Sequence, residues 1–446
     1  MRVRIRPVAA ATAIAALAAT GLAGAQAPAR AAATHPRAVA RGAFYSYTGR
    51  TPLAQVPPGT VLKTRYLSYH VAGIALPVKV VQLLYRSAGA TGKPAVNVTS
   101  VLKPPVQLGA PRAVSYQSFY DSLNPADEPS VQIAGGVTLG GVITDAESAV
   151  IAPLLLQGDT VLVPDTEGQT ADFAAGPEYG VNTLNSIRAA TSSPHTGLNT
   201  STPVGMFGYS GGAIATDWAA QLAPSYAPAV NRQLVGAAEG GVLVDPAHNL
   251  SYVSGSSVWA GVMPMAIIGI ARGYHINLQP YLSSYGRQLY GKLRKASIAT
   301  VLGAYPGLTF AQLVKPRYAN PDSIPVLVKV ENKLDTGLRA TARVPMFIGQ
   351  GADGTLEGTP GNKPGIGPGD GVMIAGDVRT LARDFCSAGT AVDYTQYDAL
   401  SHLTTFPAWT PAALTWLDAR FAGAPAPSDC GQIAPGNSLA KQHPTG

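Results

Sequence analysis

The chain has 446 residues, which is enough for one large domain with insertions or for two domains. Only 13% of the residues are charged, against about a quarter in ordinary proteins. The net charge of +7 comes from scattered lysines and arginines without interleaved aromatic residues, so the composition argues against a nucleic-acid-binding protein and favours an extracellular protein working near apolar material.

Residues 1–33 have the pattern of a secretory signal peptide. A basic start precedes a run of small and apolar residues at 8–22, and small residues at 23–25 or 31–33 would suit a signal peptidase. A membrane anchor is the alternative, but the run is short and dominated by alanine. The sequence therefore predicts export, cleavage, and a secreted mature chain with no stable membrane span.

The mature chain opens with strand patterns and then alternates strands with helices. The predicted strands are bounded by Gly or Pro and lie at 61–69, 78–85, 95–103, 113–119 and 160–164. The predicted helices between and after them lie at 142–157 and 181–190. This alternation predicts the α/β class, with a mostly parallel sheet covered by helices on both faces.

The periodicity changes at Ser210. Residues 203–208 are a short apolar run of strand type, and residues 211–223 have a helix pattern. The turn between them reads Gly208-Tyr209-Ser210-Gly211-Gly212. Its glycines let the strand and the helix approach closely, and the serine stands at a helix N-terminus that favours developing negative charge. We predict that Ser210 is a nucleophile, and the alternative is an ordinary Gly-Ser turn.

The alternation stops at about residue 245, after a strand and loop at 233–244. Residues 245–339 are mostly helical, and the stretch 258–271 is almost wholly apolar. A membrane span is not expected there, because Gly and Pro interrupt an already short run. We interpret 245–339 as a helical cap, or lid, inserted into a hydrolase core made of residues 34–244 and 340–430.

The last part of the chain returns to the alternating pattern. The predicted elements are strand 344–349, helix 377–388, strand 392–397 and helix 411–421. Residues 358–371 read as a loop without secondary structure, and residues 431–446 as a flexible tail.

Two cysteines, Cys386 and Cys430, are present in the chain. After export to an oxidising compartment an even count favours one disulfide, and the alternative is a pair of buried free thiols. No C-x-x-C pair or histidine cluster suggests a metal site.

A serine nucleophile needs a base and an orienting acid, which follow it in the chain in an α/β-hydrolase. Of the seven histidines, the two that we take to lie far enough after Ser210 in the chain to be the base are His402 and His443. His443 lies in the C-terminal tail. His402 comes directly after the final predicted strand, so we predict that it is the base. The acid is expected on the loop after strand 344–349, which carries Asp353. The alternatives are Asp370, Asp377 and Asp398.

The oxyanion formed during ester cleavage needs two N–H donors. One is expected on Gly211, the residue after the nucleophile. The second should come from a loop after an earlier strand, and we predict the backbone of Asp121 for that role. A simple turn at Asp121 is the alternative.

Several motifs together resemble the secretory lipase family, the lipase A-like group. They include Asp121-Ser122-Leu123, Asp165-Thr166-Glu167-Gly168, the turn around Ser210, and Cys386-x-x-Gly389. The resemblance covers nearly all of the mature chain. It implies an α/β-hydrolase fold with a helical lid, hydrolysis of triacylglycerols or other esters, and no cofactor. It also implies a triad of Ser210, Asp353 and His402, with Asp121 and Gly211 in the oxyanion hole.

The chain departs from this family at three places. Residues 124–129 lack a cysteine that many relatives have, the loop after Asp353 is extended over residues 355–371, and Thr166 stands where an aromatic residue is common. The leading hypothesis is a secreted serine hydrolase of fatty acyl esters that acts on a lipid or ester substrate at a lipid–water interface. The alternatives are an acyltransferase with the same triad and a non-catalytic, lipid-binding protein of hydrolase fold.

Overall fold

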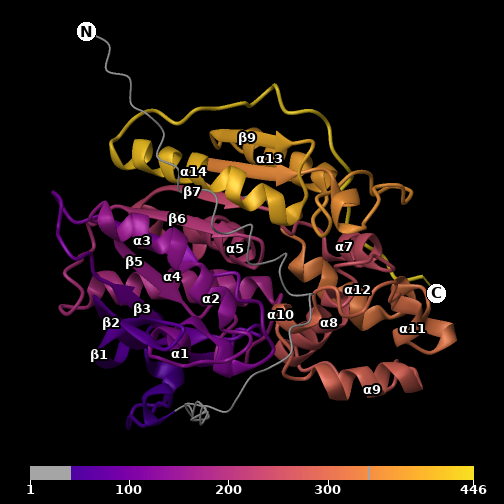
Figure 1. Cartoon of the computed structure of the whole chain (residues 1–446), viewed down its shortest axis with the longest axis horizontal. Coiled ribbons are helices and arrows are strands. Elements are labelled where there is room, and N and C mark those ends of the chain that lie inside the picture. Colours follow the sequence, from indigo (N-terminus) through magenta and orange to yellow (C-terminus); the bar gives the residue numbers. More distant parts are fainter. Residues whose placement is uncertain (1–41, 340–341, 446) are drawn as a thin grey trace, which may run out of the picture.

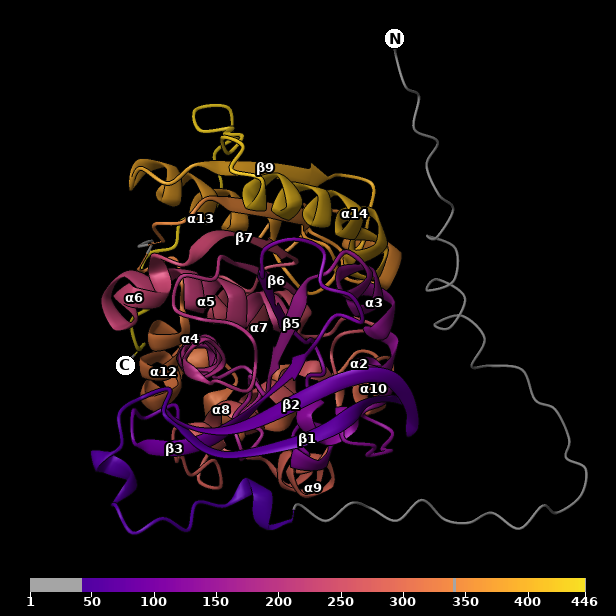
Figure 2. The same cartoon turned by 90° about the vertical axis from the view of Figure 1, so that its left-hand side faces the viewer.

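The computed structural model describes residues 42–339 and 342–445, so the predicted signal peptide lies outside the described residues. The described chain is built on one nine-stranded sheet with the strand order β1-β2-β3-β5-β4-β6-β7-β8-β9 (Figure 1). Figure 2 shows the long β1 and β2 at one end of the sheet and β9 at the other. The strands are β1 (Val61–Val71), β2 (Ile74–Ala88), β3 (Pro94–Leu102), β4 (Ala113–Gln117), β5 (Thr160–Pro164), β6 (Val204–Tyr209), β7 (Leu234–Gly240), β8 (Met346–Gly351) and β9 (Val392–Tyr397).

The sheet is antiparallel at one end and parallel elsewhere. Strands β1, β2 and β3 pair antiparallel with one another, and β3 pairs antiparallel with β5. From β5 to β9 every pair is parallel. Every residue of β4, β5 and β6 is buried, as expected of strands covered on both faces. The carboxyl ends of the parallel strands share one edge, so the loops that follow them meet there.

Two helical layers cover the faces of the sheet. Helices α4 (Gly176–Ser192), α5 (Gly211–Tyr226) and α13 (Ala375–Ser387) share a buried apolar cluster with one set of strand side chains. Helices α1 (Pro129–Ile133), α3 (Ser148–Leu156) and α14 (His402–Phe421) share another cluster with the alternate side chains. Neighbouring residues of β6, Met206 and Phe207, belong to different clusters. This alternation is the period of two of a strand, and it confirms the predicted α/β architecture.

A group of helices lies between β7 and β8 and occupies one side of the molecule (Figure 1). These helices are α7 (Pro246–Val253), α8 (Val262–Gly273), α9 (Ser284–Leu293), α10 (Ile298–Val301), α11 (Phe310–Leu313) and α12 (Pro325–Leu334), with two 3-10 turns at Pro316–Tyr318 and Pro321–Ser323. They share an apolar cluster of their own, which a few residues of the core loops join. We call residues 245–339 the cap segment. Within the described residues no helix has both the length and the apolar character needed to cross a membrane.

The remaining helical elements are short. They are α2 (Val142–Ala146), α6 (Pro228–Asn231) and the 3-10 turns Ala43–Tyr45, Leu53–Gln55, Pro125–Asp127 and Gly354–Glu357, the last of which is labelled η6. The helix predicted at 142–157 is therefore two helices, α2 and α3, which meet at Glu147. The helix predicted at 411–421 begins earlier, at His402, because the side chain of Ser401 caps its first turn.

The C-terminal tail differs from the prediction of a flexible segment. The side chains of Ile433 and Leu439 are buried in the same cluster as α13. Asn437 donates hydrogen bonds to Asp377 at 2.7 Å and to the carbonyl of Ile366 at 2.8 Å. Two apolar anchors and these paired amide groups hold the tail against the core, and such contacts are not readable from its Pro- and Gly-rich composition.

The predicted disulfide is confirmed. Cys386, at the end of α13, is bonded to Cys430. The described residues contain no free cysteine. The bond joins the last turn of α13 to the start of the tail.

Candidate active site

Ser210 lies on a strained turn between β6 and α5. Its backbone φ is 54° and its ψ is −121°, a backbone conformation that residues other than glycine rarely adopt. A β-carbon at Gly208 would stand 2.2 Å from the carbonyl oxygen of Gly212, and one at Gly212 would stand 2.0 Å from the carbonyl oxygen of Gln117. The glycines on either side are therefore required by the close approach of β4, β6 and α5.

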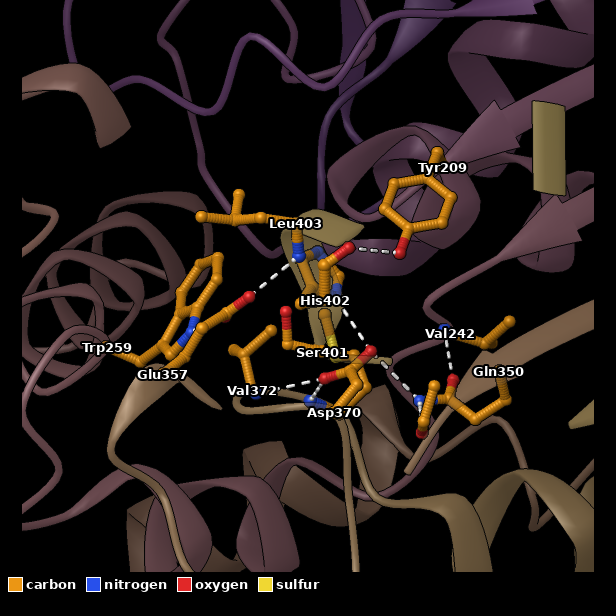
Figure 3. Close-up of polar contacts among 12 residues, drawn as sticks. Tyr209, Val242, Trp259, Gln350, Glu357, Asp370, Val372, Ser401, His402 and Leu403 are labelled. Carbon is orange, nitrogen blue, oxygen red and sulfur yellow. Dashed lines mark hydrogen bonds and ion pairs between the residues drawn. The ribbon is translucent and has the colours of Figure 1, made fainter. Parts of the chain in front are cut away.

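His402 begins α14 and is almost fully buried. Its Nδ1 lies 2.7 Å from Oδ2 of Asp370 (Figure 3). The Asp370 carboxylate is itself fixed: Oδ2 accepts a hydrogen bond from Gln350 at 2.9 Å, and Oδ1 accepts from the backbone N–H groups of Val372 and Met373 at 3.0 and 2.7 Å. The backbone N–H of His402 also donates to the carbonyl of Asp370, at 2.7 Å.

The electrostatic surroundings favour a protonated His402. Burial lowers the pKa of the imidazole, but the Asp370 carboxylate, with smaller contributions from Glu357 and Asp121, raises it, and the net shift is upward. Its Nε2 has no hydrogen-bond partner within the described structure. The side chain therefore has one nitrogen tied to a carboxylate and the other available to exchange a proton.

The carboxylate at His402 is Asp370 and not the predicted Asp353. The Asp353 side chain instead accepts a hydrogen bond from the hydroxyl of Thr355, next to it on the loop. The physical reason is the path of the long loop after β8, which turns back through a bridge between Gly369 and Ile374. Asp370 thereby lies next to Gly351, the last residue of β8, where an added β-carbon would stand 2.9 Å from that of Asp370. Neither spacing nor composition distinguishes the two aspartates.

The other two alternative acids lie elsewhere. Asp377 pairs with Nδ1 of His248 at 3.1 Å, and Asp398 accepts a hydrogen bond from Gln396 at 2.6 Å.

The structure brings the two predicted oxyanion-hole residues together. A β-carbon at Gly211 would stand 1.7 Å from Oδ1 of Asp121, so these residues are in direct contact. Asp121 also has a left-handed backbone, with φ of 34°. Burial raises the pKa of its carboxyl well above the usual range, and nearby Glu147 adds to the effect.

Two buried glutamates that sequence reasoning did not single out fix the backbone around Asp121. Glu147 accepts from the N–H of Phe119 at 2.8 Å and from the hydroxyl of Ser118 at 2.5 Å. Glu167 accepts from the N–H of Ser122 at 3.1 Å. Glu167 belongs to one of the motifs of the family resemblance, whereas Glu147 carries no signal because it lies inside an apparently continuous helix pattern.

Ser210, Gly211 and Asp121 line a cavity of about 100 Å³ between the sheet edge and the cap segment. Its other walls are mostly apolar and come from α5, α7, α8 and α12, among them Ile214, Leu250, Val253, Met263, Ile267 and Leu327. Such walls suit a hydrocarbon chain. Among the described residues no group of three or more His, Cys, Asp or Glu side chains is arranged to hold a metal ion.

Solved structures with the same fold include a lipase and an esterase. The closed state of Candida antarctica lipase A matches with a TM-score of 0.77 at 24% identity, over 92% of each chain. The rice cell wall degrading esterase LipA from Xanthomonas oryzae matches with a TM-score of 0.62 at 15% identity, over 82% of this chain and all of that one. The fold is thus that of the α/β-hydrolases, as predicted.

Curated relatives are more similar in sequence. Lipase 4 of Candida albicans is 31% identical over 386 residues, which are 84% of this chain and 80% of that protein. A protein of Mycobacterium tuberculosis named "Probable inactive lipase MT1628" is 28% identical over 375 residues, 82% of this chain and 79% of its own length. Fold and relatives together define the chain as a carboxylic ester hydrolase. The model of the family described as "Secretory lipase" matches residues 134–352 and 367–429, and the chain belongs to that family.

Proposed function

We propose that the protein is a secreted enzyme that hydrolyses fatty acyl esters, such as triacylglycerols, through an acyl-enzyme on Ser210. The observation that carries the proposal is the buried pair of His402 and Asp370, which leaves Nε2 of the imidazole without a partner within the described structure. His402 follows β9 at the carboxyl edge of the parallel strands, which is the edge where Ser210 stands on its strained turn after β6. In this role Asp370 replaces the predicted Asp353.

In the proposed mechanism His402 Nε2 takes the proton of Ser210 as its oxygen attacks the ester carbonyl. The resulting oxyanion is stabilised by the backbone N–H groups of Gly211 and Asp121. His402 then returns the proton to the leaving alcohol, which separates from the acyl-enzyme. Water repeats the two steps, and the fatty acid is released. Asp370 holds the imidazole and stabilises its protonated form.

The cap segment is proposed to act as the lid and to supply the acyl-binding surface. This part of the proposal is supported by the apolar walls that α7, α8 and α12 contribute to the cavity at Ser210. A second apolar cavity of about 60 Å³ lies within the cap segment and shares Ile267, Ile270 and Leu327 with the first. Extracellular action is proposed from the family and from the sequence pattern of residues 1–33.

The proposal is tested with a fluorophosphonate probe and with p-nitrophenyl esters of increasing chain length. Ser210→Ala should remove probe labelling and lower kcat by about 10⁶-fold, because no other nucleophile replaces the hydroxyl. Labelling or turnover that survives in this variant would refute the proposal. A wild-type protein that binds lipid but turns over no ester would instead favour a non-catalytic role like the one that the name of the mycobacterial relative states. Product analysis with added alcohols separates hydrolysis from acyl transfer.

A further inference from the structure

Residues 353–366 lie between the two segments that the family model matches. This stretch begins with η6 and with Gly358 in the left-handed conformation, φ 70°. We call residues 353–366 the bridging loop, because its contacts join the cap segment to the start of α14.

One side chain of the bridging loop makes both connections. Glu357 is 6% exposed. Its Oε1 accepts a hydrogen bond from the backbone N–H of Leu403 at 2.9 Å, and its Oε2 accepts one from the indole N–H of Trp259 at 2.5 Å (Figure 3). Leu403 directly follows His402, whereas Trp259 belongs to the cap segment. A single carboxylate therefore holds a cap residue next to the histidine.

Trp259 makes direct contact with the imidazole. Its ring lies edge-on to that of His402, with centroids 5.1 Å apart and planes at 85°. Tyr209 contacts the same imidazole, with centroids 5.0 Å apart, and its hydroxyl donates to the carbonyl of His402 at 2.6 Å. Asp370 holds Nδ1. The position of the ring is thus set by three neighbours, and one of them depends on Glu357.

The neighbourhood leaves Glu357 and Trp259 little room to move. A β-carbon at Gly371 would stand 2.8 Å from Oε2 of Glu357 and 2.9 Å from Nε1 of Trp259. Gly371 has φ of 126°, which favours glycine in any case. The loop therefore passes directly beside the hydrogen bond between these two side chains.

Further contacts fasten the bridging loop to the cap segment. The ammonium group of Lys363 donates to the carbonyls of Ser251, Tyr252 and Ser254 at 2.5, 3.0 and 2.5 Å, at the C-terminal end of α7. A cation at that end of a helix is favourable because the last carbonyls have no partners within the helix. The hydroxyl of Tyr252 also donates to the carbonyl of Thr359, at 3.2 Å.

We propose that Glu357 is a positioning residue for His402, which holds Trp259 against the imidazole and places a second negative charge beside it. This inference rests on the proposed function, since it gives Glu357 its role through the histidine base. Glu357 itself does not line the cavity at Ser210; Trp259 does. The bridging loop thus supplies part of the support of the site from outside the segments that the family model matches.

The charge of Glu357 has its own consequence. The titratable groups that face His402 are Asp370, Glu357, Asp121 and Tyr209. Burial lowers the pKa of His402, and the carboxylates raise it, Asp370 most. Loss of the Glu357 charge should therefore lower the pKa of His402. With a lower pKa, His402 stays neutral, and so able to act as a base, down to a lower pH. Its protonated form, which is present in the transition state, is at the same time less stabilised.

The test measures kcat and kcat/KM against pH, together with Tm, for the wild-type enzyme and four variants. Glu357→Gln leaves one of the two donors unpaired and removes the charge, so we expect kcat to fall about tenfold and the acid limb of kcat/KM to move to lower pH. Glu357→Asp keeps the charge, so the acid limb of its kcat/KM profile should lie at the same pH as in wild type. Trp259→Phe should lower kcat severalfold, also without moving the limb. Asp384→Asn, which removes a carboxylate on α13 whose side chain makes no hydrogen bond within the described residues, should match wild type.

An acid limb in Glu357→Gln that coincides with that of wild type would overturn the proposal. If Glu357→Gln does not fold, as its Tm would show, wild-type kcat in a folded Trp259→Phe would overturn it instead. These results are separable from failure of the proposed function, because Ser210→Ala reports on the nucleophile alone. An inactive Ser210→Ala with an unshifted Glu357→Gln profile refutes only the role of Glu357.

Discussion

Asp370 is the residue whose surroundings best define a single role. Its carboxylate contacts the imidazole of His402, and three further donors occupy its two oxygens (Figure 3). Hydrogen bonds to both oxygens of a carboxylate fix its direction. A group held in this way is suited to keep an imidazole in one tautomer and one orientation.

At the residue scale, Asp370→Asn should lower kcat by about 10³- to 10⁴-fold, because the amide stabilises the wrong tautomer of His402 and no longer stabilises its charged form. Asp353→Asn should stay within about twofold of wild type, since its side chain only bonds its neighbour on the loop. The measurement is p-nitrophenyl ester turnover by the two purified variants. A large loss of kcat in Asp353→Asn with little loss in Asp370→Asn would instead identify Asp353 as the acid of the triad.

Individual elements place the site by their ends. Ser210 precedes α5, His402 opens α14, and Asp121 follows β4. Each of these proposed site residues therefore lies shortly after a strand or at the start of a helix, and a shift of the element moves the residue. The C-terminal tail and the disulfide act on this level too, because they fasten α13, which follows directly on the loop that carries Asp370.

The disulfide should matter for stability and not for chemistry. The two cysteines are 44 residues apart in sequence. A loop of that length predicts a loss of about 3–4 kcal/mol in the free energy of unfolding for the variant with both cysteines replaced by serine, because its unfolded chain is less constrained. Thermal melts should show a lower Tm, with ester turnover at 25 °C within about twofold of wild type. An unchanged Tm would show that the tail is held by its other contacts alone.

The whole molecule contains several buried carboxyl groups with raised pKa values. Burial is the main cause in each, and it raises the pKa of Glu147 and of Glu331 to about 8, of Asp335 to about 7 and of Asp217 to about 6. In the unfolded chain such groups titrate near pH 4. Between these values the folded state binds more protons than the unfolded state, so stability is lost as pH rises.

The resulting prediction is that Tm falls between about pH 5 and pH 9. The two histidines with raised pKa values, His248 and His402, act in the same direction, because their protonated forms are favoured by folding and are lost as pH rises. Thermal melts at pH 5, 7 and 9 measure the trend. Glu331→Gln removes one contributor and should flatten it. A Tm that rises steadily over this range would contradict the prediction.

The amino-acid sequence by itself determined the features that depend on local pattern. Strands at 160–164 and 392–397 were predicted with the bounds observed, because apolar β-type runs between turn residues carry a clear period. The turn at Ser210 was recognisable because a strand pattern changes to a helix pattern at one residue. The disulfide was predictable because only two cysteines exist to pair.

Only the tertiary structure decided which side chains on the loops come into contact. Asp370 rather than Asp353 reaches His402 because a long loop folds back on itself, and Glu357 reaches Trp259 across a wide separation in sequence. The packing of the C-terminal tail likewise depends on contacts between residues that are far apart in sequence. Loops carry no period, so their sequence does not show which polar side chains they bring together, and those contacts are fixed by where distant strands and helices end.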